Sequence, residues 1–261
     1  NNHIAHYNLG AFKFDEKKFK EALEQFKLIN SNDSKTFQLR CAYLLNEKSH
    51  FNKCLDYLIN KGEVNAVIGA HTSFSESRYG IKKYNPFCND PLKYVLTSDL
   101  TKKHDFDTIF IKGVKKIINN NDIKYRDQEL LINGKQTTGD LLDQENDIVN
   151  QIKKVIHLEI KKYRIHFKNS KEGLLKNFPD EYIIKGWVVL MKSGGNLKAH
   201  MHDLGWLSGS IYINVPPKIK KNAGNLVVSI AEDDNKKEVY TSKFKKLFSF
   251  FSRMFEPNEK N

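Results

Sequence analysis

Residues 200–213 read His200-Met-His202-Asp-Leu-Gly-Trp206-Leu-Ser-Gly-Ser-Ile-Tyr212-Ile. They set two imidazoles two residues apart, where an extended segment enters a turn. Side chains at positions i and i+2 of a strand lie on one face, so both ring nitrogens can reach one metal ion. The spacing therefore predicts that His200 and His202 are metal ligands. The alternative is that two core or surface histidines meet here by chance.

The residues on either side of this pair predict short strands. Apolar runs separated by turn residues cover 186–191, 197–202, 206–215 and 225–230, with Ser-Gly-Gly-Asn at 193–196 as one of the turns. Short strands at this spacing are typical of an antiparallel double sheet or a barrel. A strand-rich C-terminal domain is therefore expected.

From Tyr125 the pattern predicts a hairpin and then a helix. Asn133-Gly134 stands between short apolar and polar runs, which is the strongest short signal for a β-hairpin. Farther along, apolar residues recur at helical spacing, which predicts a helix that Asp143 or Asp147 caps. The expected buried face consists of Ile148, Ile152, Val155, Ile156, Ile160 and Tyr163.

Residues 5–61 predict helices, because apolar residues recur there at three- and four-residue steps. A repeat of small and large residues also returns after 32 residues. Its first set is Leu9, Gly10, Phe19, Ala22 and Phe26, and its second is Cys41, Ala42, Phe51, Cys54 and Leu58. This pattern resembles a tetratricopeptide pair, whose period is about 34 residues. A plain helical hairpin packed on the second domain is the alternative.

Two such units are fewer than the roughly three that these arrays need for stability, so the region should lean on its neighbour. Tetratricopeptide units imply a protein partner, although so short an array makes peptide binding the weaker expectation. A further helix should begin at Ala66. After it, Asn85-Pro-Phe-Cys-Asn-Asp-Pro-Leu92 predicts a fixed turn, in which Cys88 is a packed thiol.

Composition and charge narrow the function classes. With 39% hydrophobic residues, a chain of 261 residues can bury a sizeable core in one or two domains. The net charge is +12, but the lysines are spread along the whole chain, without a recognition helix or an RNP-like aromatic pair. A solvated basic surface is therefore favoured over a nucleic-acid interface.

The sequence contains no apolar run of about 18 residues, and its first residues lack the pattern of a signal peptide. A cytoplasmic protein without a membrane partner is therefore expected. Cys41, Cys54 and Cys88 are odd in number and show no CxxC spacing. They argue against a disulfide framework or a zinc ribbon and favour a reducing compartment.

Several segments together resemble the 2-oxoglutarate and Fe(II)-dependent oxygenases, in the branch where an HxH is followed by a Leu-Ser-Gly-aromatic strand. They are Gln136-Thr137, Trp187-Val-Val-Leu190, Gly195-Asn-Leu-Lys-Ala-His200-Met-His202, Gly205-Trp-Leu-Ser-Gly209-Ser-Ile-Tyr212, Val215-Pro216 and Gly224-Asn-Leu226. The junction and the helical repeats also resemble relatives in which tetratricopeptide units precede the oxygenase. The resemblance covers most of residues 5–230, and 186–216 is its specific part.

That family implies a double-stranded β-helix, or jelly roll, so the expected fold is α+β. Residues 1–100 would be the helical repeat region with its junction, and residues 101–261 the jelly-roll domain with a basic aromatic tail. The resemblance also implies Fe(II) held by His200 and His202, with 2-oxoglutarate as cosubstrate on the open positions. Tyr212 is the candidate for contact with the cosubstrate, and core packing is its alternative. The implied reaction is hydroxylation of an unidentified protein or small molecule, with no catalytic residue beyond the metal ligands.

The sequence departs from the family in its ligand set. The usual pattern is His-x-Asp/Glu, so His202 stands at the carboxylate position, as it does in this branch. Asp203 would face away on a regular strand, but it could ligate if the backbone turns there, or orient a histidine. No histidine follows His202, and no arginine is placed to pair with 2-oxoglutarate. Either the chain stops before the closing strands or it is a degenerate member. The alternative function is then a non-catalytic, tetratricopeptide-type interaction module.

After Ile230 the chain looks unlike the closing strands of the family. Residues 243–255 place aromatic and apolar side chains on one helical face beside Lys243, Lys245 and other cations. This pattern leaves two interpretations, a helix for a membrane surface or a partner, and a segment docked on the protein's own exposed sheet. The second is favoured.

Overall fold

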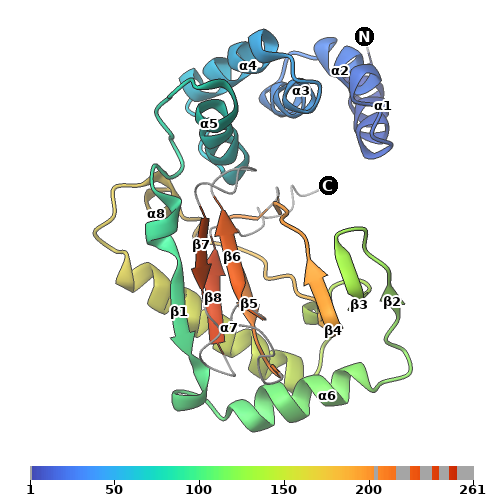
Figure 1. Ribbon diagram of the computed structural model, residues 1–261, viewed down its shortest axis with the longest axis vertical. Helices are drawn as coiled ribbons and strands as arrows, with labels where there is room; N and C mark the ends of the chain where they lie inside the picture. Colours follow the sequence, from blue (N-terminus) through green and yellow to red (C-terminus); the bar gives the residue numbers. More distant parts are fainter. Residues whose placement is uncertain (1, 203–204, 216–223, 230–236, 241–246, 252–261) are drawn as a thin grey trace. The chain divides into compact units, whose positions relative to one another are not determined.

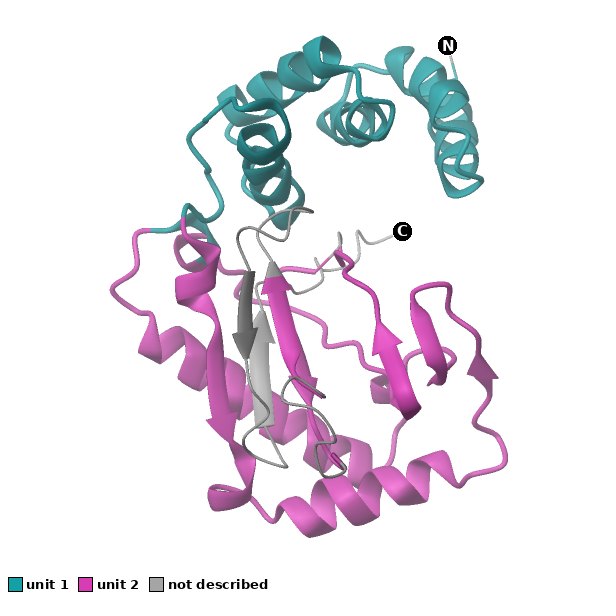
Figure 2. Ribbon diagram, in the orientation of Figure 1, with its two compact units in different colours: residues 1–89, 172–174 teal, residues 90–171, 175–261 magenta. Residues whose placement is uncertain are grey.

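The structure is a computed structural model that describes residues 2–202, 205–215, 224–229, 237–240 and 247–251. Helices and antiparallel strands both contribute, so the fold is α+β. The chain divides into two compact units (Figure 2). The first comprises residues 1–89 with 172–174, and the second comprises residues 90–171 with 175–261.

The first unit is helical where it is described. Its helices are α1 (His3–Asp15), α2 (Phe19–Lys27), α3 (Asn32–Leu44), α4 (Lys48–Asn60) and α5 (Ala66–Tyr79), coloured blue to teal in Figure 1. Each helix packs against the next one along the chain. The side chains of Asn2, Ser31 and Asn65 accept hydrogen bonds from backbone N–H groups in the first turns of α1, α3 and α5. These caps set where the three helices begin.

The core of the first unit lies between these helices. One buried cluster contains Ala22, Leu23, Phe26 and Cys41, and the other contains Leu39, Ala42, Tyr43, Phe51, Cys54, Leu55, Leu58 and Ile68. Gly10 approaches the ring of Phe26 so closely that an added Cβ would lie 2.9 Å from ring carbons. A small residue is therefore required at this helix crossing, as the repeat predicts.

The predicted 32-residue repeat holds for the buried side chains but not for the turns between the helices. Phe26 and its counterpart Leu58 are both fully buried. The turn between paired helices instead recurs after 29 residues, at Lys17 and Asn46, which both have a left-handed backbone. The turn of the second helical pair therefore comes earlier than the 32-residue repeat of the buried positions predicts, and α4 is longer than α2. The tetratricopeptide assignment stays a prediction.

One asparagine side chain fixes the Asn-Pro-Phe-Cys junction. Asn85 Oδ1 accepts hydrogen bonds from the backbone N–H groups of Phe87 (3.1 Å) and Cys88 (3.0 Å). Its Nδ2 donates to the carbonyl of Gly69 at 2.9 Å. Phe87 and Cys88 are buried, and all three cysteines of the chain are free. The fixed turn and the packed thiol are therefore confirmed.

The second unit contains short helical turns and one long helix. They are η1 (Pro91–Tyr94), η2 (Leu100–Lys102), η3 (Asp107–Lys112), α6 (Gly113–Ile118), η4 (Leu141–Asp143) and α7 (Asp147–His166). A further short helix, α8 (Gly173–Lys176), contributes residues to both units. The predicted long helix is confirmed as α7, whose residues Val155, Ile160 and Tyr163 are buried.

The cap of α7 differs from the prediction. Asn146 Oδ1 accepts a hydrogen bond from the backbone N–H of Val149 at 3.0 Å. Asp143 lies in the preceding turn η4, and Asp147 is the first residue of the helix itself. Only the residue just before the helix can reach the N–H groups of its first turn, so Asn146 takes this role.

One carboxylate is buried on α7. Glu159 is 2% exposed and pairs with Lys162 Nζ and, at 3.4 Å, with His104 Nε2. Burial alone would raise the pKa of Glu159. Hydrogen bonds from Lys162, Ser98 and His104 lower it by more than burial raises it, so the pKa lies below the usual 4.5. Glu159 is therefore ionised at neutral pH inside the second unit.

The described strands are all antiparallel. Their bounds are β1 (Leu96–Asp99), β2 (Tyr125–Arg126), β3 (Leu131–Thr137), β4 (Val189–Leu197), β5 (Ser208–Ile211), β6 (Leu226–Ser229), β7 (Lys237–Tyr240) and β8 (Leu247–Phe251). One sheet has the order β2-β3-β4, another has the order β1-β8-β5, and β6 pairs with β7. A complete jelly roll, which joins two larger sheets, stays a prediction.

The predicted hairpin at Asn133-Gly134 is wrong. Both residues lie inside β3, where the pairing with β4 is interrupted between Ile132 and Gly134. Residues 192–195 of β4 loop out opposite Asn133, whose φ is 51°. Some bulges, like tight hairpin turns, place a residue in left-handed backbone, as Asn133 is here, so an Asn-Gly pair suits both. Pairing with β4, which is distant in the sequence, decides between them.

Residues 247–251 of the tail form a strand and not the membrane-surface or partner helix, which was the less favoured of the two interpretations. They form β8, which lies between β1 and β5 and pairs with both. Aromatic residues favour a strand when neighbouring strands are available, and here two strands satisfy the backbone groups of β8 on both sides. The segment thus becomes the central strand of the protein's own sheet. Lys243, Lys245 and residues 252–255 lie outside the described residues.

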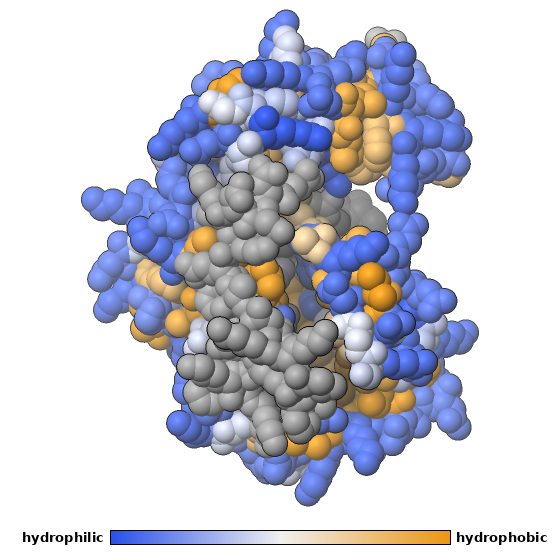
Figure 3. All heavy atoms as spheres, viewed as in Figure 1, coloured by the Kyte–Doolittle hydropathy of each residue, from blue (hydrophilic) through white to orange (hydrophobic). Residues whose placement is uncertain are grey.

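No helix in the described part of the chain is long and apolar enough to cross a membrane. Hydrophilic residues cover most of the face drawn in Figure 3, and apolar residues lie there in separate areas among them. In the first unit, buried apolar side chains form the clusters between the helices, and others, such as Ile4 and Phe12 of α1, are exposed.

Candidate metal site

The two histidines lie in the connection from β4 to β5, which leads from the edge of one sheet to the edge of another. At its start, the backbone N–H of Lys198 donates to the carbonyl of Leu130 at 2.8 Å, which continues the pairing of β3 with β4. At its end, Trp206 and Leu207 are buried. The connection is therefore held at both ends while residues 199–201 are exposed.

Two glycines permit the tight path of β4 just before this connection. Gly194 has a φ of 74°, which side chains with a Cβ rarely adopt. An added Cβ on Gly195 would lie 2.8 Å from the carbonyl oxygen of Lys192 and 3.0 Å from that of Asn133. Both neighbours are backbone atoms, one within β4 and one on β3, so a larger residue at position 195 would displace the backbone of β4 or its pairing with β3.

The side chains of His200 and His202 point toward each other. Their Nε2 atoms are 2.9 Å apart, and their ring centroids are 4.8 Å apart. His200 is exposed and His202 is half-buried. The structure thus brings together the two residues that the sequence singles out, with their Nε2 atoms in contact.

The protein itself orients the ring of His200. Its Nδ1 lies 2.9 Å from the carbonyl oxygen of Lys198. A carbonyl only accepts hydrogen bonds, so Nδ1 carries the proton and the Nε2 of the neutral ring carries a lone pair. This is the tautomer that a metal-binding histidine needs.

His202 is flanked by an indole and a hydroxyl. Its ring lies 5.4 Å from the ring of Trp187, between centroids, at an angle of 51°. Its Nδ1 lies 3.5 Å from the Oγ of Ser208, the first residue of β5. Both neighbours contact the side of the site that faces the protein, and they restrict how the imidazole turns.

The separation of the two nitrogens fits neighbouring ligands of a six-coordinate ion. Imidazole nitrogen binds a divalent metal at about 2.1 Å, so two ligands at a right angle stand about 3.0 Å apart and a tetrahedral pair about 3.4 Å apart. The observed 2.9 Å is close to the right-angle value, and it is also the length of an ordinary hydrogen bond between the two rings. A right angle is the arrangement in a facial set of two histidines and one further ligand, which suits Fe(II).

A third ligand is not found among the described residues, where no three His, Cys, Asp or Glu side chains come together. Asp203, which the sequence offers as a ligand or an orienting group, lies outside the described residues. Its role stays a prediction.

Tyr212 directly follows β5. Its side chain is half-buried, and burial raises the pKa of its phenol above the usual 10.0. The phenol is therefore neutral at physiological pH and can donate or accept a hydrogen bond. Contact with 2-oxoglutarate stays a prediction for this residue.

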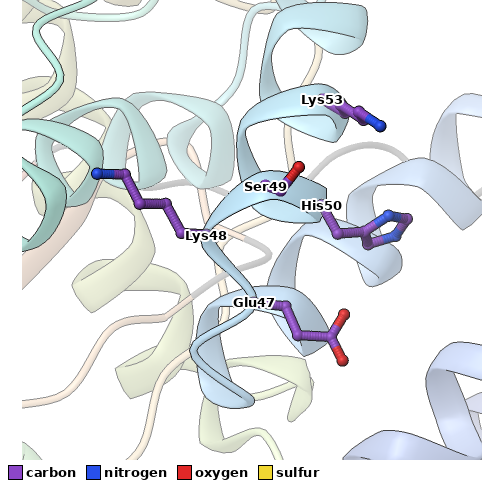
Figure 4. A pocket seen from close by; sticks show the side chains of 5 residues that line it. All are labelled: Glu47, Lys48, Ser49, His50 and Lys53. Carbon is purple, nitrogen blue, oxygen red and sulfur yellow. The ribbon is translucent and has the colours of Figure 1, made fainter.

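A second group of polar side chains lies at the start of α4. An open hollow there is lined by Glu47, Lys48, Ser49, His50 and Lys53 (Figure 4). Lys48 points away from the side on which Glu47 and His50 lie, so the lining does not converge on one point. His50 Nε2 lies 3.6 Å from Cys54 Sγ, but burial lowers the pKa of His50 and raises that of Cys54. The pair is therefore neutral and is not an activated thiolate.

The sequence patterns assigned no role to Ser208, and they included Trp187 only as part of the family resemblance. Trp187 is 37% exposed and packs against a candidate ligand, so it is not a core residue. The available signal for Ser208 was its place at the start of the strand that follows the pair. A polar residue that opens a strand beside a ligand-bearing connection can reach back to the ligands.

Comparison with known proteins bears on this site. A family model described as "Putative 2OG-Fe(II) oxygenase" matches residues 185–250, which is about a quarter of the chain. The match runs from the residues before β4 into β8, and it continues through the stretch after Ile230. The oxygenases of this family use Fe(II) and 2-oxoglutarate. No curated protein matches the chain, and no solved structure does.

Proposed function

We propose that this chain is a 2-oxoglutarate and Fe(II)-dependent dioxygenase that hydroxylates an unidentified protein or small molecule. One observation carries the proposal. The Nε2 atoms of His200 and His202 stand 2.9 Å apart within the residues that match the oxygenase family model. The spacing alone suits several metals, and a family likeness alone does not fix the chemistry. The combination favours Fe(II).

In this proposal His200 and His202 hold the metal through Nε2, and Tyr212 contacts the cosubstrate. Fe(II) and 2-oxoglutarate, when bound, supply the activation of O2 that hydroxylation of a C–H bond requires. The chain's own contribution is orientation. The carbonyl of Lys198 retains the Nδ1 proton of His200, so the Nε2 lone pair stays directed toward His202.

We also propose that the strands belong to a jelly roll and that α1–α4 form tetratricopeptide units with a protein partner. The connection that carries the histidines joins two antiparallel sheets, and each helix packs against the next. Both features support these finer assignments. The buried free thiols of Cys41, Cys54 and Cys88 support a cytoplasmic location, where thiols stay reduced.

Metal uptake tests the histidine pair. In an anaerobic titration the 261-residue chain should bind Fe(II), and His200→Ala or His202→Ala should abolish the uptake. His166→Ala is the matched control, because His166 is an exposed histidine of the same unit at the end of α7. Unchanged Fe(II) content in His200→Ala would remove His200 from the site.

Turnover of 2-oxoglutarate tests the activity. With Fe(II) and O2 the chain should convert 2-oxoglutarate to succinate slowly even without its substrate, and His200→Ala should not. A chain that neither binds Fe(II) nor forms succinate would contradict the proposal. The alternative, a non-catalytic interaction module, would then be favoured. One observation already points to it, since no third metal-ligating side chain joins the pair in the described part of the chain.

A further inference from the structure

We propose that the outer edge of β4 binds an extended, acidic segment of a protein. The segment pairs with the backbone of Trp187 and Val189 and lays an apolar side chain on the indole of Trp187. This docking rests on the strand and its surroundings alone. That the docked segment is the substrate rests on the proposed function.

Hydrogen bonds hold the backbone on both sides of Trp187. The N–H of Gly186 donates to Asp140 Oδ1 at 2.9 Å. The N–H of Val188 donates to Thr137 Oγ1 at 3.1 Å, and the carbonyl of Val188 accepts from the N–H of Thr137 at 3.0 Å. The peptide groups that flank Trp187 are therefore fixed, and its indole stands on a rigid stretch of chain.

The backbone of Trp187 itself faces away from β3. Successive residues of a strand direct their N–H and C=O groups to opposite sides, and Val188 bonds to Thr137 at the end of β3. Neither the N–H nor the C=O of Trp187 is hydrogen-bonded to any residue that the structure describes. Val189, two residues further along, has the same orientation. β4 is the outermost strand in the order β2-β3-β4 (Figure 1), so an added segment can extend this sheet.

Apolar side chains follow the same edge. Trp187, Val189 and Met191 alternate along the chain and therefore share one face of the strand. Trp187 is 37% exposed and Met191 is 49% exposed, which favours an apolar partner for this face. The ring of Trp187 lies 5.4 Å from that of His202, between centroids. A residue docked opposite Trp187 would therefore lie beside the candidate metal ligands.

The charge along this edge is positive. Residues 182–202 contain no Asp or Glu. Their exposed cations are Lys185, Lys192 and Lys198. Asp127 and Glu129 lie in the connection from β2 to β3, toward the paired side of β4. Charge complementarity therefore favours an acidic segment at the outer edge.

The same features disfavour a second copy of this chain. Two β4 edges that paired with each other would bring the lysines of both copies together, and like charges repel. Residues 192–195 also loop out directly after Met191, so the regular edge is short. Lysines and bulges on edge strands hinder pairing between identical chains. A short segment of another protein is therefore the favoured occupant.

Three matched peptides test the docking on the metal-free chain. The probe is the capped, fluorescently labelled peptide Glu-Val-Glu-Leu-Glu-Val-Glu, and its binding is followed by fluorescence anisotropy. A second peptide carries N-methyl groups on the amides of the apolar residues, and a third carries them on the inner glutamates. All three have the same side chains and charge, so they differ only in which backbone edge can pair.

Only one edge of an extended peptide can face β4. One of the two methylated peptides should therefore bind about 10-fold more weakly than the probe, the loss expected when about two backbone hydrogen bonds are removed. The other methylated peptide should bind like the probe. Equal binding of all three peptides, equal losses for both methylated ones, or no binding of the probe would overturn the proposal.

The charge of the segment has its own control. A peptide with lysine in place of every glutamate should bind about 10-fold more weakly than the probe, and added salt should reduce this difference. Equal binding of the acidic and the basic peptide would overturn the acidic part of the proposal.

Two variants of one residue test the edge of β4. Val189→Pro removes an outward N–H, which edge strands tolerate, and should weaken probe binding about 10-fold. Val189→Thr keeps the N–H on a residue that strands accept well and should bind the probe nearly like the wild type. Urea denaturation of both variants checks that the fold is kept. Wild-type affinity in folded Val189→Pro would overturn the proposal.

The oligomeric state and Fe(II) uptake separate this proposal from its alternatives. The wild-type chain should be a monomer in light scattering, and a dimer that Val189→Pro dissociates would instead assign the edge to a second copy. Probe binding by a chain that takes up no Fe(II) would uphold the docking and contradict the proposed function. Fe(II) uptake by a chain that does not bind the probe would overturn the docking alone.

Discussion

The helical unit and the histidine connection are held together by opposite means. In the helical unit, side chains such as Phe26 and Phe51 are fully buried and fill the space between successive helices. In the connection, His200 is exposed, and one backbone carbonyl, a hydroxyl and an indole contact the two rings. Burial therefore supplies stability in the first region, and directed polar contacts supply geometry in the second. Substitutions in the two regions should consequently affect different measurements.

The largest effect is expected from Phe26→Ala. The ring of Phe26 is fully buried, stacks on Phe37 at 4.6 Å and meets Tyr7 at 5.7 Å. Its removal should lower the free energy of unfolding of the helical unit by about 3–5 kcal/mol in urea denaturation. Fe(II) uptake should not change at temperatures where the variant is folded. Leu28→Ala changes an exposed residue of the same region and is the control. It should lower the free energy of unfolding by well under about 1 kcal/mol, as most surface substitutions do. A loss of Fe(II) binding in folded Phe26→Ala would break the separation of the two regions.

A smaller effect, but on both measurements, is expected from Gly195→Ala. The new methyl group would stand within 3.0 Å of backbone oxygens of Lys192 and Asn133, so the strands must move. We expect a loss of about 1–3 kcal/mol in unfolding free energy and weaker Fe(II) binding, because the connection begins directly after β4. Ser193→Ala, an exposed position of the same bulge, should leave both unchanged. Wild-type Fe(II) affinity in Gly195→Ala would show that the bulge does not position the histidines.

The smallest effect is expected from Glu159→Gln, and it depends on pH. The folded-state pKa of Glu159 lies below its usual 4.5, so its ionised form stabilises the folded chain above that pH. This contribution is lost as the pH falls through the folded-state value. Glu159→Gln should therefore cost about 1 kcal/mol at pH 7 and progressively less in acid. Denaturation curves at a series of pH values measure the difference.

Glu181→Gln is the control for that series, because Glu181 is an exposed carboxyl of the same unit. Its unfolding free energy should follow the wild type at every pH. A cost for Glu159→Gln that stays constant down to pH 3 would mean that the carboxylate charge contributes nothing.

The sequence predicted the features that depend on residues close together along the chain. The face of α7 follows from helical periodicity, and the convergence of His200 and His202 follows from their two-residue spacing. The bulge at Asn133 depended on a partner strand, so an Asn-Gly pair could not reveal it. The same reason explains β8, since its aromatic residues suit a helix face until two strands flank them. Ser208 became visible only when the path of the chain brought the start of β5 back to His202.

The central position of β8 also sets an order of events during folding. β1 and β5 do not pair with each other in their sheet; both pair with β8, which lies far from β1 along the chain. Contacts between segments so distant in sequence form slowly, because a long loop must close before they stabilise anything. The pairing of Ser208 with Phe251 therefore requires residues 247–251 to be in the sheet. If His200 and His202 hold a metal as proposed, the strand at the end of their connection has its partner only once β8 is in place.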